Sequence, residues 1–88
     1  KAINLHPSIL PLFKGAHAIT DSYNSDMQIG GVSVHWVSSE LDAGEIIAQK
    51  SFARKDKTLQ EWEEKIHKIE HKLLPKTIIK ILTKDKNA

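Results

Sequence analysis

The chain has 88 residues and a formal net charge of +2, with 40% hydrophobic and 27% charged residues. These totals describe one small globular domain, and the lack of cysteine excludes a disulfide framework and any thiolate metal site. Because no apolar run approaches the roughly 20 residues that span a membrane and glutamates are interleaved with the lysines, we expect a cytoplasmic protein without membrane or nucleic-acid partners.

The first predicted element is a short strand over residues 2–6. It ends at Pro7, because proline donates no ladder hydrogen bond and pushes the residue before it toward extended geometry. A turn-rich connection over residues 8–15 follows, and the composition of residues 16–24 predicts a short helix. Since the first residue is Lys1 rather than Met, and Ala2 and Ile3 read as the middle of a strand, we expect the chain to be part of a longer protein.

Two further strands are predicted in the middle of the chain. Apolar and polar side chains alternate over residues 32–37, which is typical of a strand with one buried face. Residues 38–44, SSELDAG, have the composition of a loop, in which Gly44 is free to adopt a positive φ. A second β-rich run covers residues 45–53, and the short connection permits an antiparallel pairing of the two strands.

A long helix is predicted to start at Thr58. Thr58 and Glu61 form a capping box, in which each side chain can accept a hydrogen bond from the other residue's backbone N–H. An apolar stripe at spacings of three and four then needs a partner surface, and it consists of Leu59, Trp62, Ile66, Ile69 and Leu73. We expect Pro75 to kink or restart the helix, and residues 83–88 to form a frayed tail.

Asn4 and His6 are polar residues in a predicted strand, just before it ends. Residues two apart in a strand share a face and lie about 7 Å apart, so both side chains can converge on one small ligand. A neutral amide donor and a protonated imidazole can bind a developing oxyanion, which is the chemistry of acyl transfer. The alternative interpretation is structural, with both side chains satisfied by hydrogen bonds inside the protein.

A second polar pair, Ser33 and His35, shares a face of the strand over residues 32–37, and Asp42 follows in the loop. A carboxylate that reached His6 would favour the protonated imidazole. Ser33, His35 and Asp42 can also be interpreted as a hydrolase triad, but no nucleophile elbow surrounds Ser33.

Four segments in order, NLHPSILPLFKGAHA, GVSVHWV, ELDAGEIIAQ and EHKLLP, carry a family resemblance that covers residues 2–82. The chain resembles the C-terminal half of the glycinamide ribonucleotide formyltransferases, folate-dependent enzymes of purine biosynthesis. The resemblance implies an α/β, Rossmann-like formyltransferase fold with about three strands, a short helix and a long Pro-kinked C-terminal helix. Residues 1–88 would form the C-terminal part of a single domain whose N-terminal, nucleotide-binding half is absent from this chain.

The resemblance also implies roles for individual residues. His6 matches the family's proton donor, Asn4 the amide that binds the formyl group, and Asp42 the carboxylate that keeps the imidazole charged. Glu70 matches the acid that contacts the ribose hydroxyls of the nucleotide substrate. Ser33 and His35 match positions where the family has polar residues that support the site. The implied folate-binding residues are Asn4, Val37, Ser38, Ser39, Glu40, Leu41 and Asp42.

The implied reaction transfers a formyl group from 10-formyltetrahydrofolate, the co-substrate, to the primary amine of glycinamide ribonucleotide, without a metal. A tetrahedral intermediate would form between Asn4 and protonated His6. In the family, the glycine-rich loop that cradles the substrate phosphate lies in the N-terminal half. We therefore expect this chain by itself to be inactive or very weak.

Two relatives of the same fold are alternatives. Formyltetrahydrofolate deformylase uses a similar Asn, His and Asp but lets water take the formyl group. Methionyl-tRNA formyltransferase is less compatible, because the segment KGAHA lacks the arginine-glycine-alanine turn and following proline associated with that enzyme.

Two alternatives come from other classes of protein. The segment HKIEH, residues 67–71, has the form of an inverted zinc-protease motif with two histidines one helical turn apart, but no third ligand is evident downstream. The long helix could also present Trp62 and Ile66 to a partner protein, as a small interaction module would.

Overall fold

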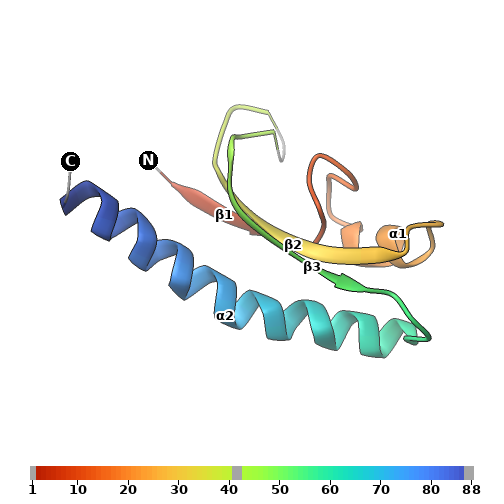
Figure 1. The fold of residues 1–88 in the computed structure, drawn as a ribbon. Coiled ribbons are helices and arrows are strands. Elements are labelled where there is room, and N and C mark those ends of the chain that lie inside the picture. The colour runs from red at the N-terminus through yellow and green to blue at the C-terminus, as the bar shows by residue number, and fades with distance from the viewer. Residues whose placement is uncertain (1, 41–42, 87–88) are drawn as a thin grey trace.

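A computed structural model describes residues 2–40 and 43–86, and its element order is mixed α/β (Figure 1). The elements are β1 (Ile3–His6), α1 (Ala18–Tyr23), β2 (Ile29–Trp36), β3 (Ile46–Ala53) and α2 (Leu59–Lys86). Within the described ranges, none of the helices combines the length and the apolar character that crossing a membrane requires.

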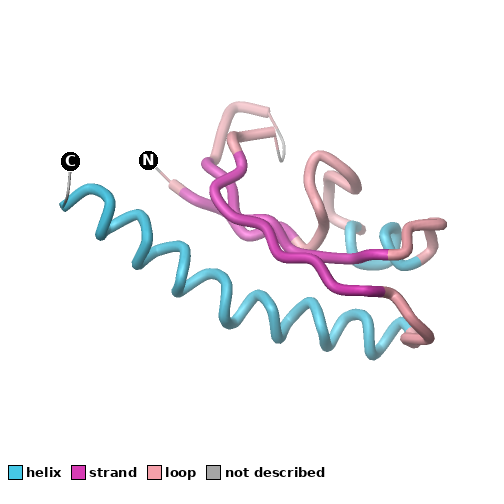
Figure 2. Tube along the Cα trace, in the orientation of Figure 1, coloured by secondary structure: helices cyan, strands magenta, loops and turns pink. Residues whose placement is uncertain are grey.

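The three strands form one sheet in the order β1-β2-β3, and both pairs are antiparallel. The predicted antiparallel pairing of the second and third strands is therefore confirmed. Helix α2 runs along one face of the sheet, while the connection after β1 and the loop between β2 and β3 rise on the other side (Figures 1 and 2). One face of the sheet therefore packs against α2 and forms the core, and the other face lies beneath the two connecting segments.

The core lies between the sheet and α2. Its buried residues are Val32, Phe52, Trp62 and Ile66. The ring of Trp62 meets Phe52 edge to face, with centroids 5.0 Å apart, and the ring of Tyr23 at 5.6 Å. Gly30 lies directly beneath Trp62, where no side chain would fit. Full burial of one large apolar side chain contributes about 1.5–3 kcal/mol, so this cluster is the main support of the fold.

The predicted apolar stripe of α2 is confirmed for most of its members. Trp62 and Ile66 are fully buried, and Ile69 and Leu73 pack against the same cluster. Leu59 differs, because it stands in the first turn of the helix and is 40% exposed. Since Trp62 is buried against the chain's own strands, it is not available to a partner, and the interaction-module interpretation is wrong.

Helix α2 begins as predicted and ends later than predicted. The backbone N–H of Thr58 donates to Glu61 Oε1 at 2.9 Å, and the N–H of Glu61 donates to Thr58 Oγ1 at 3.2 Å, which confirms the capping box. The helix then continues unbroken through Pro75 to Lys86, so it does not restart at Pro75, and residues 83–86 are helical and not a frayed tail. Proline removes one hydrogen bond of the ladder, and the bonds on both sides suffice to continue the helix.

Arg54, at the end of β3, ties α1 to the sheet. Its Nε donates to the carbonyl of Met27 at 2.7 Å, and its Nη2 donates to the carbonyl of Tyr23 at 2.8 Å. The guanidinium also lies 4.5 Å from the ring centre of Trp62. One charged side chain therefore satisfies carbonyls at the C-terminus of α1 and stacks on the core at the same time.

Candidate active site

Four polar side chains of β1 and β2 share one face of the sheet. Asn4 pairs with His35 and His6 pairs with Ser33 in the antiparallel register, and residues directly opposite each other in such a pair project to the same face. Since Gly30, on the other face of β2, lies under Trp62 of α2, this polar face is the one that α2 does not cover. The structure thus brings together two pairs that are far apart in the sequence.

His6 is buried in this face, and Asn4 next to it is exposed. Nε2 of His6 lies 2.8 Å from the carbonyl oxygen of Phe13. A carbonyl only accepts hydrogen bonds, so Nε2 carries a proton.

The connection that supplies this carbonyl folds back over the polar face. Phe13 adopts a φ of 56°, which is uncommon for a residue with a side chain. The hydroxyl of Ser8 donates to the carbonyl of Leu12 at 2.7 Å and lies 3.3 Å from that of Phe13. These hydrogen bonds close residues 8–13 into a compact turn with its carbonyls directed inward.

Ser33 anchors the same turn to the sheet. It is fully buried, and its hydroxyl donates to the carbonyl of Ser8 at 2.7 Å and accepts from the backbone N–H of Leu10 at 3.0 Å. A buried hydroxyl with these partners cannot attack a substrate. The hydrolase-triad interpretation is therefore wrong, and Ser33 acts as a brace for the turn beside His6.

Gln49 on β3 belongs to the same group, and we did not predict it from the sequence. It stands opposite Ser33 in the register, and its Nε2 donates to Ser33 Oγ at 2.9 Å and to the carbonyl of Leu10 at 3.0 Å. The only available signal was its place in a strand predicted to pair with the strand of Ser33. That signal does not specify which residues face each other.

His35 lies under the start of the loop between β2 and β3. It is buried, and its Nδ1 is 3.0 Å from the carbonyl oxygen of Trp36. A Cβ added to Gly44 would collide with that same carbonyl group, and Gly44 has no positive φ. Gly44 does not use the positive φ that glycine permits, and the reason for glycine here is the close approach of the loop to Trp36.

The loop itself starts with exposed residues, and a hollow of about 310 Å³ lies beside its base. The hollow is lined by Ala2, Trp36, Val37, Ser38, Gly44 and Glu45. Two of the predicted folate-binding residues, Val37 and Ser38, therefore border a cavity, and Ser39 and Glu40 continue the exposed loop. Leu41 and Asp42 lie outside the described residues, so the proximity of Asp42 to His6 stays a prediction.

Glu70 is not brought to the polar face. It lies on α2, which packs on the opposite side of the sheet, and its Oε1 is 2.7 Å from Nδ1 of His67. One substrate that contacted both His6 and Glu70 would have to reach around an edge or an end of the sheet. In residues 2–40 and 43–86 no group of three or more metal-binding side chains is found, so the HKIEH segment has no third zinc ligand there.

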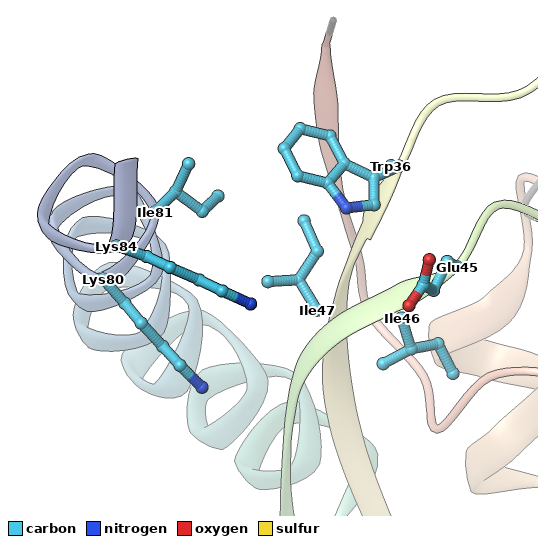
Figure 3. A pocket seen from close by; sticks show the side chains of 7 residues that line it. All are labelled: Trp36, Glu45, Ile46, Ile47, Lys80, Ile81 and Lys84. Carbon is cyan, nitrogen blue, oxygen red and sulfur yellow. The ribbon is translucent and has the colours of Figure 1, made fainter. Parts of the chain in front are cut away.

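A separate hollow of about 420 Å³ opens on the α2 side of the sheet (Figure 3). Two lysines of α2, Lys80 and Lys84, point toward it from one wall, and Trp36 and Ile47 stand on the other. Its lining contains none of the predicted site residues. The candidate active site is therefore the polar face with the loop beside it.

Comparison with known proteins identifies the class. The family model described as formyl transferase matches residues 1–78, and the chain belongs to this family.

Individual relatives indicate which kind of formyl transferase the chain resembles. The chain is 41% identical over 83 residues to the phosphoribosylglycinamide formyltransferase of Bacillus subtilis, covering 93% of this chain and 43% of that protein. It is 64% identical, with a TM-score of 0.90, to the crystal structure of phosphoribosylglycinamide formyltransferase from Campylobacter jejuni, covering 92% of this chain and 43% of the other.

A related enzyme is similar at lower identity. The crystal structure of a formyltetrahydrofolate deformylase from Pseudomonas syringae is 28% identical, with a TM-score of 0.80, over 86% of this chain and 26% of the other. The chain therefore spans less than half the length of the proteins it matches, and the resemblance inferred from its four sequence segments is confirmed.

Proposed function

We propose that the full-length protein transfers a formyl group from 10-formyltetrahydrofolate to the primary amine of glycinamide ribonucleotide, in purine biosynthesis. The observation that carries this proposal is the placement of Asn4 and His6 on one polar face, beside a cavity bordered by Val37 and Ser38. Membership of the formyl transferase family and the names of the relatives support the same reaction.

In the proposed mechanism, the amine of the nucleotide attacks the formyl carbon. The formyl oxygen gains negative charge in the tetrahedral intermediate, and the exposed amide of Asn4 and the protonated imidazole of His6 stabilise it. Since Nε2 of His6 is held by Phe13, the ring has a defined orientation before the substrate binds. Such preorganisation lets the charged imidazole act without rearrangement in the transition state.

Breakdown of the intermediate expels tetrahydrofolate, whose departing nitrogen needs a proton, and we assign protonated His6 as the donor of that proton. We assign Asp42 to keeping the imidazole charged and to accepting, through water, the proton lost by the attacking amine. General acid catalysis of this kind typically contributes about 10²- to 10⁴-fold in rate. The reaction proceeds through these side chains and needs no nucleophilic residue.

Binding of the folate is assigned to the loop over residues 37–42 and the cavity at its base. Contact with the ribose hydroxyls is assigned to Glu70. The remaining contacts, including those to the substrate phosphate, belong in this proposal to the N-terminal half of the domain, which we place outside this chain. The 88-residue chain assayed alone should therefore show little or no formyl transfer, whereas the full-length protein should be active.

The decisive assay incubates full-length protein with 10-formyltetrahydrofolate, with and without glycinamide ribonucleotide. We expect tetrahydrofolate to form only when the nucleotide is present, in equal amount to the formylated nucleotide. A deformylase, the alternative that the Pseudomonas syringae structure favours, would release formate at the same rate without the nucleotide. That result would exclude the proposed transferase.

A further inference from the structure

We propose that Gln49 is a positioning residue for His6, which acts through the turn formed by residues 8–13. The role of His6 in catalysis comes from the proposed function, whereas the positioning itself depends only on the contacts below. Gln49 makes no contact with the imidazole, and the link between them passes through the backbone of the turn and the carbonyl of Phe13.

The first step is the unusual backbone at Phe13. Its carbonyl holds Nε2 of His6, and its φ of 56° belongs to a region that residues with side chains rarely adopt. Such conformations persist only where the surrounding structure holds them in place. The orientation of the imidazole therefore depends on whatever fixes this turn.

The second step is that both backbone polar groups of Leu10 are fixed from the sheet. Its N–H donates to Ser33 Oγ at 3.0 Å, and its carbonyl accepts from Gln49 Nε2 at 3.0 Å. Gln49 Nε2 also donates to Ser33 Oγ at 2.9 Å, which leaves the hydroxyl proton of Ser33 for the carbonyl of Ser8. The amide of Gln49 thus completes the set of hydrogen bonds that holds the turn.

The third step is the location of Gln49. It stands on β3, which in the described part of the chain lies at an edge of the sheet, and it is an exposed residue. The buried cluster of Val32, Phe52, Trp62 and Ile66 lies on the other face. A substitution at Gln49 can therefore loosen the turn without opening a cavity in the core, which separates positioning from general stability.

The test uses Gln49→Met and Gln49→Glu in the full-length protein. Met keeps the approximate shape without a donor, and Glu keeps the size but cannot donate to the carbonyl of Leu10. We expect kcat to fall about 10-fold with little change in KM, which is less than the roughly 100-fold loss that a 1 Å misplacement can cause. We also expect the NMR signal of the Nε2 proton of His6 to weaken or disappear through faster exchange with water.

The matched control is Gln60→Met, at an exposed position on α2 where the amide donates to Glu64 Oε1 at 3.2 Å. It should change neither kcat nor the signal of His6. Unchanged kcat and an unchanged Nε2 proton signal in both Gln49 variants would overturn the proposal, even if the melting temperature fell. If the wild-type protein showed no formyl transfer, the proposed function would fail, and the NMR comparison alone would support or overturn the positioning role.

Discussion

Gly44 lies against the carbonyl group of Trp36 so closely that no side chain fits between the loop and the end of β2. Both residues line the hollow at the base of this loop, together with Val37 and Ser38. The shape of the proposed folate cavity is thus set by a contact between two backbone segments.

Replacing Gly44 by Ala should push the loop away from Trp36 and enlarge the cavity. We expect the KM for 10-formyltetrahydrofolate to rise about 10-fold, which corresponds to about 1.4 kcal/mol of lost binding, while the KM for the nucleotide changes little. Steady-state kinetics of the full-length protein measures both constants. Ala43→Ser, an exposed change at the neighbouring position, should leave them unaltered, and equal effects of the two substitutions would contradict this account.

His6 carries the largest predicted effect on the chemical step. His6→Gln removes the cationic imidazole, so kcat should fall by about 10²- to 10⁴-fold. The melting temperature should change little, because Gln can still donate to the carbonyl of Phe13. The matched control is His71→Gln, an exposed histidine on α2, which should retain full activity. A loss of activity in His71→Gln but not in His6→Gln would contradict the proposed role of His6 and favour a metal site in the HKIEH segment.

Arg54 is expected to matter for stability because a single guanidinium joins α1, the following loop and the ring of Trp62. Arg54→Lys should lower the free energy of unfolding by about 2 kcal/mol, since hydrogen bonds to charged groups contribute about 1.5–3 kcal/mol and an ammonium cannot reproduce the fork geometry. Urea denaturation of the full-length protein provides the measurement. Lys68→Arg on the exposed side of α2 should have no such effect, and full stability of Arg54→Lys would show that the planar geometry is unimportant.

The start of α2 predicts one pH effect. Hydrogen bonds from the backbone and side chain of Thr58 lower the pKa of the Glu61 carboxyl below its usual value of 4.5. Because the pKa of Glu61 is lower in the folded state, its carboxylate stabilises the helix fully at pH values above the usual pKa of 4.5. This contribution is lost as the pH falls through the folded-state pKa. In Glu61→Gln, the decrease in melting temperature on acidification below about pH 4.5 should be smaller than in the wild type. Glu63→Gln, an exposed position two residues after Glu61 and outside the capping box, should behave like the wild type.

Local patterns sufficed for much of the fold. The capping box at Thr58 and the alternation in β2 are encoded in neighbouring residues, and both are found in the structure. Strand periodicity alone predicts that Asn4 and His6 share one face of the sheet. What could not be predicted depends on the register between strands, which brings Gln49 opposite Ser33, and on the close approach of Gly44 to Trp36. Contacts of this kind arise only when distant segments pack together.

Strand β1 carries Asn4 and His6 and occupies an edge of the sheet, since in the described part of the chain it pairs only with β2. An edge strand can pair with another extended segment through its outward N–H and C=O groups. Concentrated solutions of the 88-residue chain should therefore form intermolecular β-structure, in which a second molecule adds its strand beside the imidazole. Handling the fragment at low concentration would keep this self-association from masking the residual chemistry of His6.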